Sequence, residues 1–196
     1  MSEYQDVAEE VILQAKEGDK LAQGKIVKQY EHMVYNIALR LMGNVEDAEG
    51  VMQETFIKVL DALPSFRGDS KLSTWIYRIA ANFAMMELRK RKRIFLSLDD
   101  YTFNENRDFA SFTRSITENP ETLLQNNELR EVMDEAIEEL PPKYKTAFVM
   151  KDLQGLSLKQ VAKILDMNIA TVKTHVRRAR LFLRDKLTDY VHEAEK

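Results

Sequence analysis

The helical spacing of apolar residues is the feature that most constrains the fold. Through most of the chain, apolar side chains return every three or four residues, and glycine or proline separates one such segment from the next. No segment alternates apolar and polar residues convincingly, as a half-buried β-strand would. The pattern therefore predicts an all-α protein, with helices over 7–16, 21–42, 45–63, 128–140 and 144–153.

Three residues mark expected helix ends in the first half of the chain. Gly43 is the predicted stop of the second helix, and Asn44 is the predicted N-cap of the third. Ser73 is the predicted N-cap of a fourth helix, which ends in the basic run RKRKR at 89–93.

The segment 97–127 differs in composition from the rest of the chain. Its helical periodicity weakens, Asn, Ser and Thr become frequent, and acidic residues outnumber basic ones. A loop of about 30 residues without its own core is uncommon inside one compact domain. The sequence therefore predicts two small helical domains, 1–96 and 128–196, joined by a flexible acidic linker at 97–127.

Composition argues against several classes of protein. No apolar run approaches the roughly 18 residues that a membrane span needs, and the first residues are acidic where a signal peptide is basic, so we expect a cytoplasmic chain. There are no cysteines, and His32, His175 and His192 are scattered, so we expect no metal and no cofactor. No catalytic triad pattern or phosphate-binding glycine loop stands out, and we expect no enzyme.

The stretch from Leu158 to Arg180 reads as a helix-turn-helix. Ser157 and Gln160 form a predicted capping box for a helix over 158–165, and Asp166 begins a tight turn in which a left-handed backbone is expected. A second helix starts near Ile169. Its predicted buried positions are Val172, Val176, Ala179, Leu183 and Leu187.

The second of these helices carries a cluster of basic residues, although the net charge of the chain is −3. Cations near a helix C-terminus complement its dipole, and we favour this interpretation for Arg184 and Lys186. It does not apply to Lys173, which lies near the helix start, so we favour DNA contact over a solvated surface. The candidate DNA-binding residues are Thr171, Lys173, Thr174, Arg177 and Arg178.

Three stretches in this order resemble bacterial sigma factors of the extracytoplasmic-function (ECF) group. NVEDAEGVMQETFIKVL is similar to their polymerase-binding helix, FRGDSKLSTWIYRIAANFAMMELRKRKR to the segment that reads the minus-10 promoter element, and LQGLSLKQVAKILDMNIATVKTHVRRAR to the helix-turn-helix for the minus-35 element. With AKEGD near the start, the resemblance covers nearly the whole chain. Gly50 stands where the family more often has an acid, and Asp166 where it often has glycine.

The resemblance implies a role for each part of the chain. Domain 1–96 corresponds to sigma region 2 and domain 128–196 to sigma region 4. On the helix over 45–63, a predicted core stripe of Val45, Ala48, Met52, Phe56, Val59 and Leu63 leaves an acidic outer face that, by resemblance, binds core RNA polymerase. The residues carried over for this contact are Asp47, Glu49, Gln53 and Glu54.

The minus-10 residues also follow from the resemblance. The loop of Arg67, Gly68, Asp69, Ser70 and Lys71 is expected to capture an exposed base, and Arg78, Asn82 and Arg89 are expected to face the neighbouring DNA. For Trp75 a core position is favoured over a stacking platform. The linker is interpreted either as a segment that threads toward the active-site and RNA-exit channel of polymerase or as a plain tether.

The resulting prediction is a promoter-specificity subunit that binds core RNA polymerase and promoter DNA and is held inactive by an anti-sigma factor. It needs no obligate homo-oligomer. The main alternative is an autonomous dimeric helix-turn-helix regulator, which leaves the acidic helix and the FRGDSK loop without a role. A helical protein-interaction module with incidental basic clusters and a nucleic-acid enzyme are further alternatives.

Overall fold

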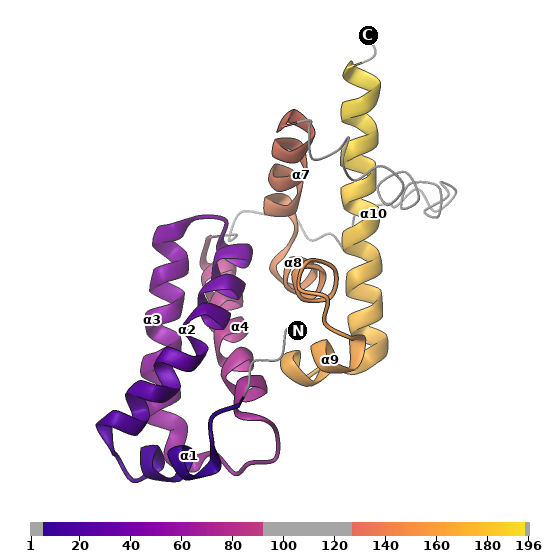
Figure 1. Cartoon of the computed structure of the whole chain (residues 1–196). Helices are drawn as coiled ribbons and strands as arrows, with labels where there is room; N and C mark the ends of the chain where they lie inside the picture. The colour runs from indigo at the N-terminus through magenta and orange to yellow at the C-terminus, as the bar shows by residue number, and fades with distance from the viewer. Residues whose placement is uncertain (1–5, 92–126, 195–196) are drawn as a thin grey trace.

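The computed structural model describes residues 6–91 and 127–194, and all regular structure in these two stretches is helical (Figure 1). The all-α prediction is confirmed. The first region contains α1 (Glu9–Lys16), α2 (Lys20–Met42), α3 (Val45–Ala62), the short 3-10 helix η1 (Leu63–Ser65) and α4 (Leu72–Arg91). The second contains α7 (Asn127–Glu139), α8 (Pro142–Phe148), the π-helical turn η3 (Val149–Leu153), α9 (Leu158–Leu165) and α10 (Ile169–Ala194). The predicted linker lies outside the described residues except for Asn127, and the domain boundaries remain a prediction.

The junction of α2 and α3 follows the sequence signals. Gly43 ends α2 with a left-handed backbone, φ 76°, which glycine adopts without the steric cost of a Cβ. The side chain of Asn44 then accepts a hydrogen bond from the backbone N–H of Asp47 at 3.0 Å and caps α3. Both predictions for this junction are confirmed, and the carboxylate of Asp47 lies in the first turn of α3, near its positive end.

Two local predictions in the first region are wrong. Helix α4 begins at Leu72, so Ser73 lies inside its first turn, where it is buried against the second region and does not cap the helix. On α3, Val45 is 54% exposed, whereas Val51 and Thr55 are buried. The buried Thr55 hydroxyl does not remain unpaired, because it donates a hydrogen bond to the carbonyl of Val51 at 2.7 Å. A pattern based on residue polarity alone does not predict a buried threonine here.

The interpretation of Arg184 and Lys186 as cations in a last helical turn is also wrong, because α10 continues to Ala194. Arg184 is buried and donates to Asp185 at 2.9 Å from Nε. Lys186 lies 2.6 Å from a carboxylate oxygen of Glu139 on α7. These cations therefore contact neighbouring carboxylates of the second region.

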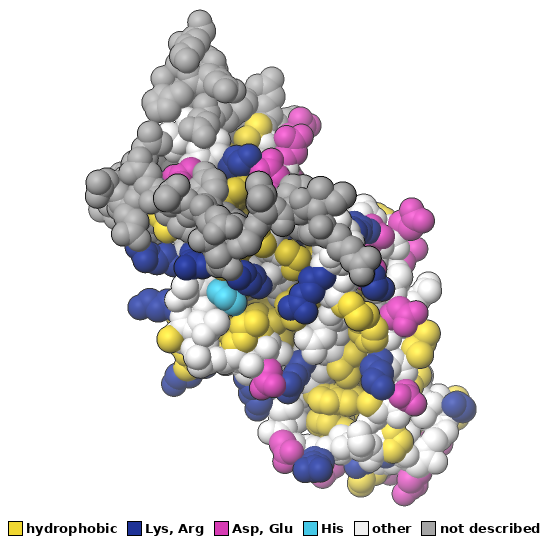
Figure 2. Space-filling model, turned by 180° about the vertical axis from the view of Figure 1, so that it is seen from behind, with side chains coloured by type: hydrophobic (Ala, Val, Ile, Leu, Met, Phe, Trp, Pro, Cys, Tyr) yellow, Lys and Arg dark blue, Asp and Glu magenta, His cyan; other side chains and the backbone are white. Residues whose placement is uncertain are grey.

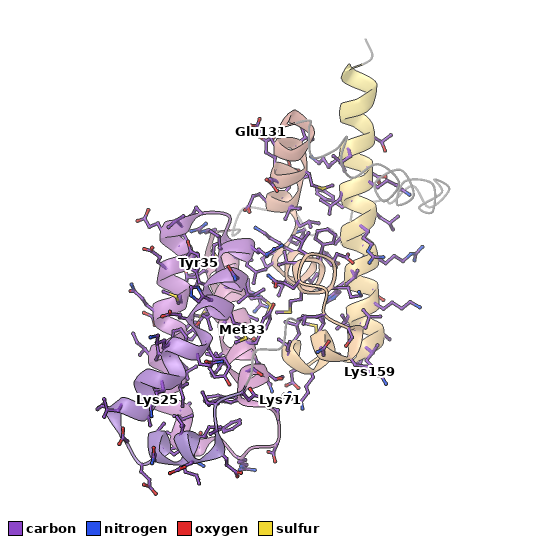
Figure 3. All side chains as sticks on the ribbon, in the orientation of Figure 1. Lys25, Met33, Tyr35, Lys71, Glu131 and Lys159 are labelled. Atoms are coloured by element: carbon purple, nitrogen blue, oxygen red, sulfur yellow. The ribbon has the colours of Figure 1, made fainter. Side chains whose placement is uncertain are left out.

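The two regions pack directly against each other. Helix α4 contacts α8 and α9, and α2 contacts η3 (Figure 1). The apolar cluster that fills the first region continues into the second through residues such as Val149, Met150 and Ile164. Side chains fill the space between α4 and the second region (Figure 3). A separate cluster around Tyr144 and Phe182 holds α7, α8 and α10 together.

Residues 6–91 and 127–194 lack membrane-spanning and metal-binding features. None of their helices combines the length and apolar character required to cross a membrane. They contain no group of three or more His, Cys, Asp or Glu side chains positioned to hold a metal ion.

Candidate polymerase and promoter interfaces

The outer face of α3 is acidic, as the sequence predicts. Ala48 and Phe56 turn inward, and Glu49, Gln53 and Glu54 are exposed together on the other side. Asp47 is half-buried and forms an ion pair with Arg91 at the end of α4. Three of the four candidate polymerase contacts are therefore accessible, and Asp47 contacts polymerase only if it leaves or shares its pair with Arg91.

The loop between η1 and α4 holds the five candidate residues for minus-10 base capture. Arg67, Gly68, Asp69 and Lys71 are exposed, and Gly68 has φ 79°, where a side chain would strain the backbone. Behind the loop, the rings of Phe66 and Trp75 lie 5.1 Å apart between centroids at 43°. Both are partly buried against the core. Trp75 thus supports the base of the loop, in line with the core position favoured for it.

Helix α1 and the residues before it hold both ends of this loop. Lys16 Nζ donates to the carbonyl of Phe66 at 3.0 Å, and the carboxylate of Asp6 lies 3.8 Å from Nζ of Lys71. Tyr30 donates to the same carboxylate at 2.9 Å, and burial, then the Asp6 carboxylate, raises the pKa of Tyr30. A hollow of about 420 Å³ separates α1 from the loop. Sequence reasoning missed these supports because Lys16 and Phe66 are 50 positions apart, and no local pattern links them.

The candidate residues on α4 extend from the loop along one side of the helix. Asn82 and Arg89 are exposed. Arg78 is partly exposed and donates to the carboxylate of Asp166 in the second region at 2.9 Å. Arg78 and Asn82 therefore lie on one side of α4, the helix that follows the loop. Arg78 already contacts a protein group, the Asp166 carboxylate.

The helix-turn-helix is built by three local contacts. Gln160 N–H donates to the Ser157 hydroxyl at 3.3 Å, and Ser157 N–H donates to the Gln160 side chain at 2.9 Å, which confirms the capping box. Asp166 has φ 55° and ψ 46°, the left-handed turn that the sequence predicts. The Asn168 side chain then accepts from the N–H of Thr171 at 2.7 Å. These contacts fix the start of α10.

Fewer basic side chains of α10 are exposed than the sequence predicts. Lys173, Thr174 and Arg177 are exposed. Arg178 is half-buried and donates to the Tyr144 hydroxyl at 2.8 Å. Arg180 donates from Nε to Asp152 at 2.8 Å, and this hydrogen bond raises the pKa of Arg180. Seen from behind, Lys and Arg side chains gather in a band across the middle of the molecule (Figure 2).

Two family models match the chain, and their order agrees with the order of these sites. Sigma-70 region 2 matches residues 26–94, and Sigma-70, region 4 matches residues 130–183. The chain is 35% identical to ECF RNA polymerase sigma factor SigW of Bacillus subtilis over 178 residues, which cover 91% of this chain and 95% of that protein. It is 37% identical to the ECF RNA polymerase sigma-E factor of Escherichia coli over 180 residues, which cover 90% and 92%.

Solved structures share the fold. One is CnrH in complex with the cytosolic domain of CnrY, with a TM-score of 0.57 and 22% identity over 93% of this chain and 96% of that chain. Another is the sigma factor RpoE of Bartonella quintana in complex with the anti-sigma factor NepR, with a TM-score of 0.57 and 21% identity over 84% and 96%. At this level of identity the similarity shows the fold alone.

The fold and the basic helix-turn-helix define a DNA-binding protein of the transcription apparatus. The full-length relatives make this assignment specific. The chain belongs to the ECF RNA polymerase sigma factors, the subunits that give RNA polymerase its promoter specificity.

Proposed function

We propose that this sigma factor binds core RNA polymerase through the acidic face of α3. The residues for this contact are Asp47, Glu49, Gln53 and Glu54. Complementary charge steers such an encounter and fixes its register more than it adds raw affinity. The observation that carries the proposal is the co-occurrence on one chain of this acidic face, the 66–71 loop and a basic helix-turn-helix, in the order of the family.

The promoter is read at two places. The loop of Arg67 to Lys71 captures an unpaired minus-10 base, and Arg78, Asn82 and Arg89 contact the adjacent strand. At the minus-35 element Lys173, Thr174 and Arg177 reach the major groove. Thr171 lies at the first turn of α10, where it can bond a phosphate. Arg178 takes part only if it exchanges Tyr144 for DNA.

An anti-sigma factor controls the protein. CnrH was solved in complex with the cytosolic domain of CnrY, and the Bartonella quintana sigma factor in complex with the anti-sigma factor NepR; we extend such a complex to the present chain. Its activity is in the cytoplasm, where RNA polymerase acts, and it catalyses no reaction itself, in keeping with a family of initiation factors. Failure to recover any inhibitor with the silent factor from its native cell would contradict this part of the proposal.

In vitro transcription from a genomic promoter library, with bacterial core polymerase, tests the function. Start sites should appear only when this protein is added. They should be lost in Glu49→Arg/Glu54→Arg, which reverses charge on α3, and in Lys173→Ala/Arg177→Ala. Lys28→Ala, which removes an exposed cation from α2, is the matched control and should keep them. Symmetric half-site footprints without polymerase would instead support the dimeric regulator.

A further inference from the structure

Tyr144 of α8 lies where α8 packs against α10 (Figure 1). Its side chain has no exposed surface and belongs to the apolar cluster that holds α7, α8 and α10 together. Its ring meets the ring of His175 on α10 edge-on, with the centroids 5.2 Å apart and the planes at 90°. Packing from both helices therefore fixes the position of Tyr144.

Two cations from different helices lie close to this ring. Nζ of Lys143, the preceding residue on α8, is 4.9 Å from the Tyr144 ring centroid. The guanidinium carbon of Arg178 on α10 is 6.0 Å from the same centroid, and the Tyr144 hydroxyl accepts its 2.8 Å hydrogen bond. At these distances the electron-rich face of an aromatic ring attracts a cation. One fixed ring therefore gathers two positive charges, and both side chains are partly exposed.

The chemistry of the partner distinguishes Arg178 from Arg180. Arg180 pairs with the carboxylate of Asp152, which neutralises its charge. A phenol hydroxyl, in contrast, carries no charge and accepts only one of the five N–H groups of a guanidinium. The contact with Tyr144 therefore fixes Arg178 without neutralising it. Arg178 would have to leave Tyr144 to read a base, but it can bind a phosphate in place.

The position of Arg178 on α10 suits a phosphate better than a base. Lys173, Thr174 and Arg177 are exposed together on the face that we assign to the major groove. Successive residues of a helix are about 100° apart around its axis, so Arg178 lies on the flank of this face, where α8 packs. A helix in the major groove has a phosphate backbone on each side, and side chains on its flanks meet phosphates. Lys143 lies on the same flank, because it is close to the same ring as Arg178.

We propose that Lys143 and Arg178 bind the phosphate backbone of one DNA strand beside the minus-35 element, and that Tyr144 is the positioning residue that holds Arg178 for this contact. Lys143 thereby adds a DNA-binding residue from α8, outside the helix-turn-helix. The contact contributes to affinity and register, and it carries no base preference. The inference rests on the proposed minus-35 function of α10.

The salt dependence of promoter binding tests Lys143. The probe is a promoter duplex taken from the start sites of the transcription library, bound by core polymerase that carries the full chain. Lys143→Met should weaken binding about fivefold at every minus-35 sequence. It should also lower the slope of log affinity against log salt concentration by about 0.9, the value for one phosphate. An unchanged slope, or a change in base preference, contradicts the proposal.

Lys186→Met is the matched control. Lys186 also lies over an aromatic ring of the second region, 5.6 Å from the centroid of Phe182, but the Glu139 carboxylate pairs with its charge at 2.6 Å. It lies about 12 Å further along α10 than Arg178. Its substitution should leave both the slope and the affinity unchanged. A slope that falls equally in both variants would indicate a general charge effect and would contradict a local contact.

Neutral methylphosphonate groups, placed at single positions along the minus-35 element of the same duplex, locate the contact. At one or two adjacent positions the replacement should weaken binding of the wild-type complex about fivefold. At those positions it should not weaken binding of the Lys143→Met complex, which has already lost the contact. Equal losses in both complexes at every position would show that Lys143 binds no phosphate.

Tyr144→Phe tests the positioning role, because it keeps the ring and its packing and removes only the hydroxyl. It should weaken promoter binding about threefold, since Arg178 is no longer held. In the Arg178→Ala background the same substitution should have no effect, whereas a purely structural role would give the same loss in both backgrounds. Equal losses, tighter binding by Tyr144→Phe, or wild-type affinity in Arg178→Ala would each overturn the positioning role.

The same experiments separate this inference from the proposed function. If the wild-type chain yields no core-dependent start sites, the sigma function itself fails, and the inference fails with it. If start sites appear and depend on Lys173 and Arg177, but Lys143→Met and Tyr144→Phe bind the promoter like the wild type, only the phosphate contact is refuted.

Discussion

Lys145 shows how one buried charge links the second region to the first. The residue has no exposed surface, and its ammonium group lies 2.6 Å from the Glu138 carboxylate. Burial lowers the pKa of Lys145, Glu138 opposes this effect, and Arg91 of the first region lowers the pKa further. The protonated form is therefore less favourable in the folded protein than in the unfolded chain.

This burial predicts a pH-dependent stability with a definite sign. Between the lowered pKa and the ordinary value of about 10.4, the unfolded chain binds more protons, so the free energy of unfolding rises with pH in that window. Lys145→Met should remove this slope and raise the free energy of unfolding by about 1 kcal/mol at pH 7, since the half-exposed Glu138 can be hydrated. Urea unfolding of both proteins at several pH values measures it. Identical slopes would contradict it.

Lys16 lies outside the residues that the family models match, and we expect its substitution to affect the minus-10 loop. Lys16→Met removes the hydrogen bond to the Phe66 carbonyl, so the loop should lose part of its positioning. We expect promoter opening to fall by roughly tenfold, equivalent to about 1.4 kcal/mol, while minus-35 binding stays unchanged. Permanganate reactivity of unpaired thymines measures opening. Lys20→Met, which loses only an exposed contact with Gln23, is the matched control.

At the level of elements, the end of α2 should be more sensitive to substitution than a comparable turn. Gly43 and Gly155 have φ of 76° and 68°, so alanine pays a similar backbone cost at both. Only at Gly43 does a Cβ meet Glu138, and moving that side chain weakens its contact with Lys145. Gly43→Ala should therefore lower the free energy of unfolding by about 1–2 kcal/mol more than Gly155→Ala. Equal losses in denaturant titrations would contradict it.

Substitutions at two positions of α10 should have different effects on DNA binding. Lys173 is exposed near the helix start, whereas Arg180 is held by Asp152. Lys173→Ala should weaken discrimination at one minus-35 position by about 1–3 kcal/mol. Arg180→Ala should lower stability and leave base preference unchanged. Binding to a set of single-base minus-35 variants distinguishes the two, and a preference shift in Arg180→Ala would refute the assignment.

Sequence patterns predicted the features that depend on residues close together in the chain. The capping box of Ser157, the stop at Gly43 and the buried face of α10 each depend on residues within a turn or two, and each is confirmed. The residue type of Ser73 suits an N-cap, but its side chain is buried against α9 instead. The helix-dipole interpretation of Arg184 is wrong because composition does not reveal that α10 continues to Ala194.

At the scale of the whole molecule, the sequence predicted which residues are candidates for DNA contact but not which of them are accessible to DNA. The sequence named Arg78 and Arg178 as DNA contacts, yet their protein partners Asp166 and Tyr144 are 88 and 34 positions away. Periodicity and charge carry no information about such distant pairs. The packing of α4 on α9 was missed for the same reason, because two regions separated by a polar segment gave no signal of mutual contact.

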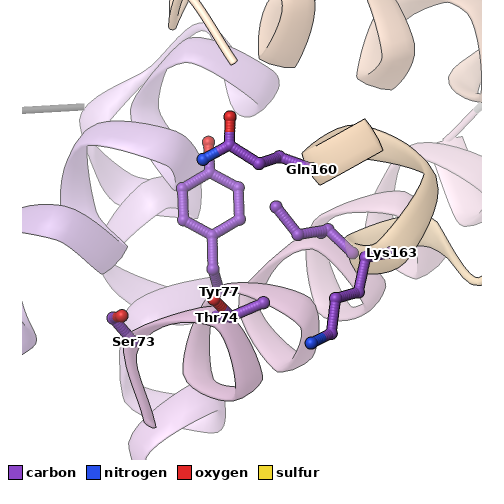
Figure 4. A pocket seen from close by; sticks show the side chains of 6 residues that line it. Ser73, Thr74, Tyr77, Gln160 and Lys163 are labelled. Carbon is purple, nitrogen blue, oxygen red and sulfur yellow. The ribbon is translucent and has the colours of Figure 1, made fainter. Parts of the chain in front are cut away.

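The shared apolar cluster predicts that the two regions unfold together in the free protein. Because the cluster runs from α2 and α4 into η3 and α9, loss of one region exposes apolar surface on the other. Calorimetry of the full chain should show a single transition, with equal calorimetric and van't Hoff enthalpies. Thr74 and Lys163 line the same small cavity between α4 and α9 (Figure 4), so a chemical cross-link between cysteines introduced at these two positions should raise the midpoint without splitting the transition. Two separate transitions would contradict this coupling.

The contact of Arg78 with Asp166 also couples two properties that selection would otherwise tune separately. A substitution of Arg78 changes a proposed promoter contact and, at the same time, a contact between the two regions. A variant of Arg78 that shifts minus-10 preference should thus also alter how α4 packs against the turn after α9. Divergence of promoter preference among relatives should then be accompanied by compensating changes at the turn after α9.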